Sequence, residues 1–161
     1  MEQVLVLGNG FIGNRLKDSY KCDISDKKIT TLKEAEDEIN KYNPRIIINT
    51  IGSIGERYSD DCELTQEKTL TANSFVPLML AEIAIRKNIK LVHFSSGCIY
   101  RYDFAKDEPL KEERVPDFFD LFCSRTKIYA ERALDTLSNA YNILIIRIRM
   151  PLDYYPHRRN L

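Results

Sequence analysis

The stretch that decides the fold lies at the start of the chain, where residues 4–13 read VLVLGNGFIG. Val4 to Leu7 is a short run of β-branched and aliphatic residues, which is typical of a strand buried on both faces. The next six residues match the pattern G-x-G-x-x-G, with glycines at positions 8, 10 and 13. We therefore predict a strand, a tight glycine turn and a helix that begins at Phe11.

Each glycine of this turn has its own physical task. Gly8 makes the tight turn, Gly10 lets the backbone approach a pyrophosphate, and Gly13 lets the helix pack close to the strand. The N-terminus of the helix then offers free N–H groups and the positive end of its dipole to phosphates. The stretch predicts a dinucleotide site, and the plain alternative is a glycine turn that binds no ligand.

Apolar runs and amphipathic stretches alternate along the rest of the chain. The runs with the character of buried strands lie at residues 45–50, 90–94 and 141–148, with a short second strand in 20–24. Helical spacing of apolar residues predicts helices at 11–17, 32–42, 70–87 and 122–137. Pro77 is a candidate kink and Ser124 a candidate N-cap. We expect residues 1–161 to form one Rossmann-type α/β domain, a doubly wound parallel sheet with helices on both faces.

Composition excludes several classes of protein. The 161 residues carry a formal net charge of zero, so nothing draws the whole chain to nucleic acid or an anionic membrane, although the tail at 156–159 (PHRR) is a local basic patch. The chain has only two histidines, and its four cysteines include no Cys-x-x-Cys pair, so no metal site is expected. The first apolar run is too short for a signal peptide or a membrane span. We expect a reduced, cytoplasmic protein.

The choice between NADP and NAD stays open on this evidence. An acidic residue about twenty positions after the glycines usually binds the ribose 2′-hydroxyl of NAD. Asp18, Asp23 and Asp26 lie in this region, but the short second strand does not single one out. Asp23 and Asp26 fit a polar loop or a helix cap better. We keep a slight preference for NADP.

Several later stretches together resemble one family of enzymes. They are SGCIYRYD (96–103), KEE (111–113), SRTK (124–127) and RIRMP (147–151). In combination they resemble the extended short-chain dehydrogenases of the NAD-dependent epimerase/dehydratase superfamily. The closest likeness is to the UDP-4-keto-6-deoxyglucose 3,5-epimerase/4-reductases of UDP-rhamnose synthesis and the related dTDP-4-dehydrorhamnose reductases. The resemblance implies a nicotinamide cofactor and a nucleotide-sugar substrate.

The resemblance also implies roles for individual residues. The residues that would bind the cofactor are Gly8, Gly10, Phe11, Ile12, Gly13, Asn49, Thr50, Ile51, Gly52, Ser95, Lys127, Met150 and Pro151. Asn73 would support the site. Ser96 matches the catalytic serine or threonine that hydrogen-bonds the 4-keto oxygen, and Cys98 matches a cysteine used as acid or base in epimerisation. Lys127 would bind the nicotinamide ribose and lower the pKa of the catalytic tyrosine.

Two features depart from the family pattern. The family's Y-x-x-x-K has cysteine in place of tyrosine, at Cys123 before Lys127. A thiol is intrinsically more acidic than a phenol, with a pKa of about 8.5 against about 10, so its shorter reach is the obstacle. We expect a loss of about 10²–10⁴-fold, or turnover carried by a water relay. The chain also ends at Leu161, and we expect the C-terminal sugar-binding region of the family to be missing unless a partner chain or a second copy completes it.

Plain structural roles compete with these assignments. Cys98 and Cys123 also fit small buried hydrophobes, and Ser95 and Ser96 also fit a turn after a strand. The DCE stretch at 61–63 fits a helix start or a loop better than catalysis, and Arg57 and Arg101 fit ordinary solvated charges. Two function classes therefore stand side by side: a reductase and epimerase with impaired activity, and a non-catalytic NAD(P)-binding regulatory or partner subunit. A remnant half of a split enzyme is a third reading.

Overall fold

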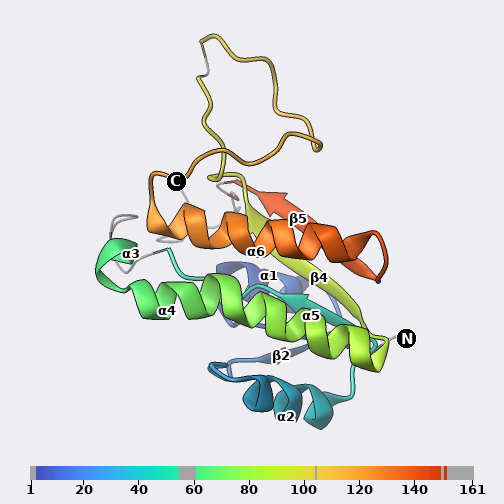
Figure 1. The fold of residues 1–161 in the computed structure, drawn as a ribbon. Coiled ribbons are helices and arrows are strands. Elements are labelled where there is room, and N and C mark those ends of the chain that lie inside the picture. The colour runs from blue at the N-terminus through green and yellow to red at the C-terminus, as the bar shows by residue number, and fades with distance from the viewer. Residues whose placement is uncertain (1–2, 55–60, 104, 150, 152–161) are drawn as a thin grey trace.

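Five parallel strands form one sheet in the order β2-β1-β3-β4-β5 (Figure 1). The strands are β1 (Val4–Leu7), β2 (Asp23–Ser25), β3 (Ile46–Asn49), β4 (Lys90–Ser96) and β5 (Ile143–Ile148). The structure is a computed structural model that describes residues 3–54, 61–103, 105–149 and 151. The strand order reverses direction between β1 and β3, and in such sheets ligands bind outside the carboxyl ends of the strands at the point of reversal.

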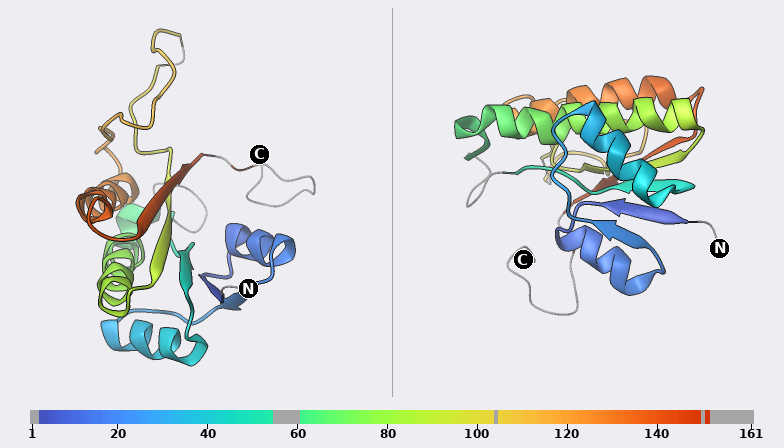
Figure 2. Two further views of the ribbon diagram at one scale, coloured as in Figure 1. Left: turned by 90° about the vertical axis from the view of Figure 1, so that its right-hand side faces the viewer. Right: turned by 90° about the horizontal axis from the view of Figure 1, so that it is seen from below.

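Helices cover the two faces of the sheet unequally. The helices are α1 (Phe11–Ser19), α2 (Leu32–Tyr42), α3 (Asp61–Leu64), α4 (Gln66–Leu70), the π-helical turn η1 (Thr71–Phe75), α5 (Val76–Lys87) and α6 (Phe122–Ser138). One face carries α2, α5 and α6, and of the helices in the described residues α1 alone lies on the other (Figure 2). The prediction of a doubly wound Rossmann-type sheet with helices on both faces is confirmed, and so is the short second strand. No helix in the described ranges is long and apolar enough to cross a membrane.

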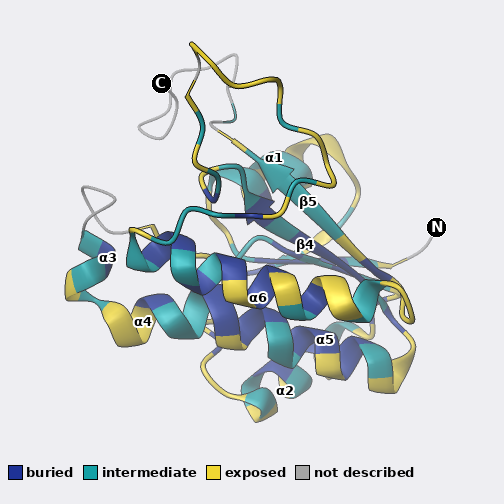
Figure 3. Cartoon of the chain, turned by 45° about the horizontal axis from the view of Figure 1, so that its top comes forward, coloured by how far each residue is buried: buried dark blue, intermediate teal, exposed yellow. Residues whose placement is uncertain are grey.

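The main core lies between the sheet and its three-helix face. Leu5, Ile47, Leu91 and Ile143 lie side by side on β1, β3, β4 and β5, and all of them are buried (Figure 3). They pack against apolar side chains of the covering helices such as Leu80 of α5. Their alternation with outward-facing neighbours is the period of two that a strand imposes.

The opposite face of the sheet is only partly covered. Val92, Leu144, Phe94 and Ile146 share this face by register, whereas α1 packs on β1 and β2. Leu144 is 46% exposed, although it sits in the middle of an apolar strand. We call these four residues the open face; β5 beside it is an edge strand.

Several element boundaries and one cap differ from the sequence predictions. The second strand begins at Asp23 rather than Tyr20. The long helix predicted over 70–87 is interrupted by η1 directly before Pro77, because proline has no N–H to continue the regular pattern. The prediction that Ser124 caps α6 is wrong: the N-cap is Leu121, and the Ser124 hydroxyl donates instead to the Cys98 carbonyl at 3.1 Å.

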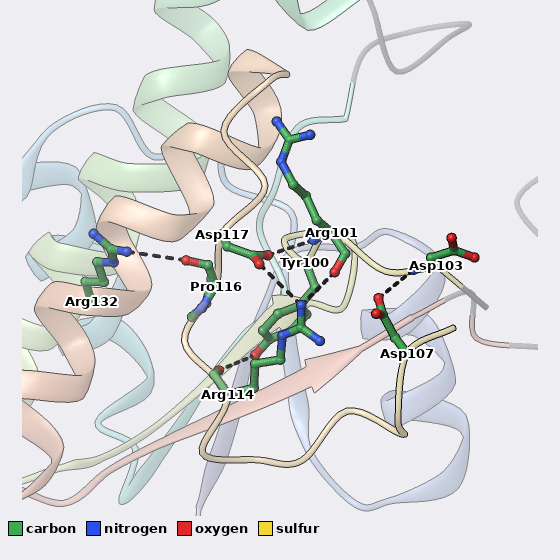
Figure 4. A network of polar contacts seen from close by, with 8 residues as sticks. All are labelled: Tyr100, Arg101, Asp103, Asp107, Arg114, Pro116, Asp117 and Arg132. Atoms are coloured by element: carbon green, nitrogen blue, oxygen red, sulfur yellow. Dashed lines mark hydrogen bonds and ion pairs between the residues drawn. The ribbon is translucent and has the colours of Figure 1, made fainter. Parts of the chain in front are cut away.

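A long loop, residues 97–121, protrudes from the body between β4 and α6 (Figure 1). Its described part is held by its own polar contacts (Figure 4). The backbone N–H of Arg101 donates to Asp117 at 2.7 Å, and the Arg114 guanidinium donates to the Arg101 carbonyl at 2.8 Å. Tyr100 donates its hydroxyl to the Arg114 carbonyl at 3.1 Å. These contacts use the backbone of Arg101; its side chain is exposed and pairs with the exposed Asp120, which fits the solvated charge expected from the sequence.

Candidate functional site

The glycine turn between β1 and α1 forms a closely packed cradle. Gly8 has a φ of +105°, a conformation that side chains disfavour. A Cβ on Gly13 would lie 1.9 Å from the Gly8 carbonyl oxygen, so the first turn of α1 packs directly on the end of β1. These are the tasks that the sequence assigns to the first and third glycines.

Gly10 differs from its neighbours because a Cβ there would meet nothing within 4 Å. It is the N-cap of α1, with extended backbone, so the space beside it lies at the N-terminus of this helix. A diphosphate fits such a space because backbone donors and the helix dipole both face it. The cradle therefore suits a dinucleotide.

The segment after β3 closes the cradle from the neighbouring strand. The Thr50 hydroxyl lies 3.0 Å from both the Leu7 and the Gly8 carbonyl oxygens, and the Thr50 N–H donates to Leu7 at 2.9 Å. Thr50 thereby fixes the NTIG segment (49–52) against the glycine turn. The two segments that the sequence assigned to cofactor binding lie together at the carboxyl edge of the sheet.

A buried amide–imidazole pair supports the same edge. Asn49 on β3 lies 3.0 Å from Nδ1 of His93 on β4, and its side-chain oxygen accepts from the Ile51 N–H at 3.0 Å. Burial first, and the nearby Lys127 charge second, lower the pKa of His93 to about 4. His93 is therefore neutral at physiological pH and accepts from the Asn49 amide.

Asn73 sits in the π-helical turn and holds three segments together. Its side-chain oxygen accepts from the Ser53 N–H at 2.7 Å, and its amide donates to the Ser53 carbonyl at 2.9 Å and to the Thr126 hydroxyl at 3.2 Å. Ser74, the next residue, donates to the Thr126 carbonyl at 2.7 Å. The extra residue of a π turn lets two consecutive side chains reach α6. This geometry agrees with the supporting role predicted for Asn73.

Helix α6 brings Lys127 and Cys123 to this edge. A Cβ on Gly52 would lie 3.9 Å from the Lys127 ammonium, an ordinary van der Waals contact, so Lys127 lies beside the NTIG segment. Burial lowers the pKa of Lys127, and the thiols of Cys123 and Cys98 act in the opposite direction. A lysine with a lowered pKa beside a glycine-lined opening suits hydrogen bonding to a bound ligand.

Cys123 lies one helical turn before Lys127 and is buried. Its thiol donates to the Ser53 carbonyl at 3.7 Å. Burial, followed by a hydrogen bond with Cys62, raises the pKa of Cys123 to about 12. The thiol is therefore protonated at neutral pH and is a weaker acid than a free phenol. The expectation that acidity is no obstacle at this position is wrong, because burial adds a second obstacle to the short reach of the side chain.

The two serines at the end of β4 point in different directions. Ser95 is buried and donates to Glu131 of α6 at 2.5 Å, so its hydroxyl is engaged away from the carboxyl edge. Ser96 accepts from the Cys98 N–H at 3.1 Å, which keeps Ser96 and the exposed Cys98 together at the edge. Ser96 and Cys98 are placed where the sequence put them, and the cofactor role of Ser95 stays a prediction.

Other predicted residues lie at the rim or outside the described part. Pro151 is half-buried after β5. Met150, Arg57 and the tail at 156–159 lie outside the described residues. Asp23 and Asp26 are exposed at the two ends of β2. Among the residues described, no group of three or more His, Cys, Asp and Glu could hold a metal ion.

The sequence and the fold are similar to those of known proteins. Residues 3–160 match the family described as RmlD substrate binding domain. The chain belongs to the RmlD family. A bifunctional dTDP-4-dehydrorhamnose 3,5-epimerase/dTDP-4-dehydrorhamnose reductase from Arabidopsis thaliana is 33% identical over 122 residues, which are 72% of this chain and 39% of the relative. The resemblance read from the sequence is thereby confirmed.

Solved structures of similar proteins have the same architecture. The crystal structure of a UDP-rhamnose synthase from Acanthamoeba polyphaga mimivirus matches with a TM-score of 0.85 and 25% identity, over 99% of this chain and 60% of that one. A dTDP-4-dehydrorhamnose reductase from Bacillus anthracis in complex with NADP matches with a TM-score of 0.82 and 20% identity, over 98% of this chain and 57% of that one. This RmlD-family chain thus spans about 40–60% of each of these relatives.

Sequence reasoning missed three supports of this RmlD-family edge. His93 stands out as a polar residue in an apolar strand, which is a signal of a buried partner. Glu131 and Arg147 form a buried ion pair at 2.9 Å and gave no signal, because their partners are distant in the sequence. The DCE stretch starts a helix as expected, since α3 begins at Asp61. Sequence reasoning missed that Glu63 also accepts from the Phe122 N–H of α6, at 2.6 Å.

Proposed function

We propose that the chain binds NADPH or NADH in the glycine cradle and acts as a nucleotide-sugar 4-keto reductase and 3,5-epimerase of the dTDP- or UDP-rhamnose type. The observation that carries this proposal is the open space beside Gly10, facing the N-terminus of α1, with Lys127 at the same edge. Lys27 and Lys28 follow the carboxyl end of β2 and could pair with a 2′-phosphate, which favours NADPH. A cytoplasmic location stays a prediction from the sequence.

Different residues at the carboxyl edge of the sheet would carry different steps of the reaction. A nicotinamide cofactor supplies a hydride when bound, and reduction of a ketone builds negative charge on its oxygen. The Ser96 hydroxyl would donate to that oxygen, and the Lys127 cation would stabilise the charge. Cys98, exposed beside Ser96, would exchange protons at the sugar carbons next to the ketone.

Cys123 decides how fast this chemistry runs. It occupies the position of the family's tyrosine, but its thiol is short and already donates to the Ser53 carbonyl. We expect turnover about 10²–10⁴-fold below that of a tyrosine-bearing relative, because one proton donor is misplaced. Cys123→Tyr should raise the rate of NADPH oxidation with a 4-keto-6-deoxy nucleotide sugar. If turnover is undetectable in both forms while the cofactor still binds, the reductase assignment fails.

A second candidate function rests on the same cysteine. A proton donor turned into the protein suits a chain that binds the dinucleotide without turning it over, as a regulatory or partner subunit. Cofactor binding with no turnover, before and after Cys123→Tyr, is the outcome that favours this candidate.

We also propose that further polypeptide, from a partner chain or a second copy, covers the open face and completes the sugar site. Of the four apolar side chains Leu144 is 46% exposed and Val92 is buried; they lie beside β5, the edge strand of the sheet within the described residues, and exposed apolar residues and strand edges mark interaction sites.

Calorimetric titration with NADPH and NADH tests whether the chain binds a dinucleotide, on which the proposed function depends. We expect saturable binding of one dinucleotide per chain, tighter for NADPH. Absence of binding with both nucleotides contradicts the proposed function and the second candidate alike.

A further inference from the structure

The short helix α3 clamps the first turn of α6, the helix that carries Cys123 and Lys127. Glu63 accepts from the Phe122 N–H at 2.6 Å, and its second oxygen lies 3.5 Å from the Arg125 guanidinium. The neighbouring Cys62 accepts from the Cys123 N–H, with 3.3 Å between that nitrogen and its sulfur. The clamp therefore places two cysteines against each other across two elements that are far apart in the sequence.

The thiols of Cys62 and Cys123 are buried side by side. Cys62 is 0% exposed and Cys123 is 7% exposed, both are free thiols, and their side chains are hydrogen-bonded to each other. The other two cysteines differ: Cys22 lies before β2 and Cys98 is exposed after β4. Hydrogen-bonded thiols are within reach of a disulfide after small rotations of the side chains, since the bond needs the Cβ atoms roughly 3.5–4.5 Å apart.

We propose that Cys62 and Cys123 form a reversible disulfide that staples α3 to α6. The oxidant is a peroxide: each thiol gives up its proton, one S–S bond forms, and two electrons reduce one hydrogen peroxide to two waters. A dithiol reductant reverses the reaction by thiol–disulfide exchange.

The staple changes the site at the position of the family's tyrosine. The reduced Cys123 thiol is a proton donor beside Lys127, and the oxidised sulfur has no proton to give. Residual turnover that depends on this donor should therefore stop on oxidation and return on reduction. This consequence rests on the proposed function, whereas the disulfide itself does not.

The environment of the pair also sets the pace of oxidation. A thiolate is the form that reacts, and Cys123 holds its proton up to about pH 12. We expect cross-linking to be slow at neutral pH and to speed up with each unit of pH. The exposed Cys98 lacks this burial and should react with an alkylating reagent first.

Peptide mapping under non-reducing conditions tests the proposal directly. Trypsin places each cysteine in its own peptide: Cys22 in 22–27, Cys62 in 58–68, Cys98 in 91–101 and Cys123 in 115–125. After treatment of the full chain with hydrogen peroxide, we expect 58–68 joined to 115–125, and their separation by dithiothreitol. If the four peptides stay unlinked, or if either cysteine pairs only with Cys22 or Cys98, the proposal is overturned.

Variants distinguish the effect of the Cys62–Cys123 disulfide from other effects of oxidation on the chain. Oxidation of the wild type should raise the melting temperature by about 5–10 °C. Cys62→Ser should abolish both the cross-link and this shift, and the matched control Cys22→Ser should keep them. A shift that survives Cys62→Ser contradicts the proposal. A cross-link that forms without changing NADPH turnover contradicts the role of Cys123 as a donor and leaves the disulfide intact.

Discussion

Gly13 and Gly10 belong to the same turn but differ in the space around them. A side chain on Gly13 collides with the Gly8 carbonyl at 1.9 Å, whereas one on Gly10 projects into open space. Gly10 also has an ordinary φ of −72°, which any residue adopts. The fold therefore needs Gly13, and the proposed ligand needs Gly10.

Gly10→Val should weaken NADPH binding at least tenfold and leave the melting temperature nearly unchanged, because the side chain fills the space meant for the diphosphate. Gly13→Ala is the matched comparison and should destabilise the fold by about 1–3 kcal/mol through overpacking. Titration calorimetry and thermal melting check the pair. Unchanged affinity in Gly10→Val would place the cofactor elsewhere.

The buried His93 makes stability depend on acidity. Its pKa in the folded chain is about 4, below its ordinary value of 6.5, so the folded state resists protonation. The stabilisation is complete above pH 6.5 and falls by about 3 kcal/mol as the pH drops to 4. Denaturant unfolding at several pH values measures this loss. His93→Gln keeps an acceptor for Asn49 and should flatten the dependence; an equally steep curve in the variant would assign the effect to other groups.

Sequence patterns foresaw residues whose role is local and missed those whose role depends on distant partners. The glycine turn between β1 and α1 forms as the local pattern predicts, because turn geometry depends on neighbouring residues. The sites of Thr50 and Lys127 were implied by the family resemblance, and their roles stay predictions. Ser124 fitted an N-cap but bonds to Cys98, twenty-six positions earlier in the chain. The pairing of Cys62 with Cys123 spans sixty-one positions, and no local pattern encodes it.

At the scale of elements, a buried ion pair joins α6 to the ends of β4 and β5. Glu131 is 1% exposed, accepts from Ser95 and lies 2.9 Å from the Arg147 guanidinium. Arg147 also donates to the Glu112 carbonyl in the long loop and lies over the Tyr100 ring. One side chain thus ties the edge strand, the helix and the loop together.

Arg147→Met should destabilise the fold by about 3–5 kcal/mol, because it leaves the Glu131 carboxylate buried without its counter-charge. Replacing both partners, as Glu131→Leu with Arg147→Met, should cost far less, since no charge stays buried. Urea unfolding of the single and double variants measures the difference. Equal losses in the two would show that packing, rather than charge, dominates here.

Elements were predicted better than their ends. The span of α2 is as predicted, because a capping box of Thr31 and Glu34 starts it and Asn43, in the left-handed conformation, ends it. The π turn before Pro77 was not foreseen beyond a kink, since its extra residue is stabilised by contacts of Asn73 and Ser74 with α6. Tertiary contacts of this kind override local propensity.

At the scale of the molecule, the unequal coverage of the sheet is the main feature. The open face and the β5 edge are apolar, and the formal net charge of zero gives little repulsion between copies. A chain with such a surface should associate when no other polypeptide covers it.

Leu144→Lys should weaken this association without unfolding the chain, because its side chain is already half exposed. Sedimentation velocity over a range of concentrations should show larger species for the wild type and a shift toward monomer for the variant. Circular dichroism provides the check on folding. A wild-type chain that stays monomeric at every concentration would count against the open face as an interface.

The position of β1 between β2 and β3 has a consequence for synthesis on the ribosome. The glycine cradle and the threonine that locks it all lie within the first fifty residues, and the strands that flank β1 pair within the same span. We expect this part to assemble while the remainder is still being translated. The lysine and thiol of α6 join it only after the long loop has emerged, so we expect the glycine cradle and the α6 side chains beside it to form at separate times.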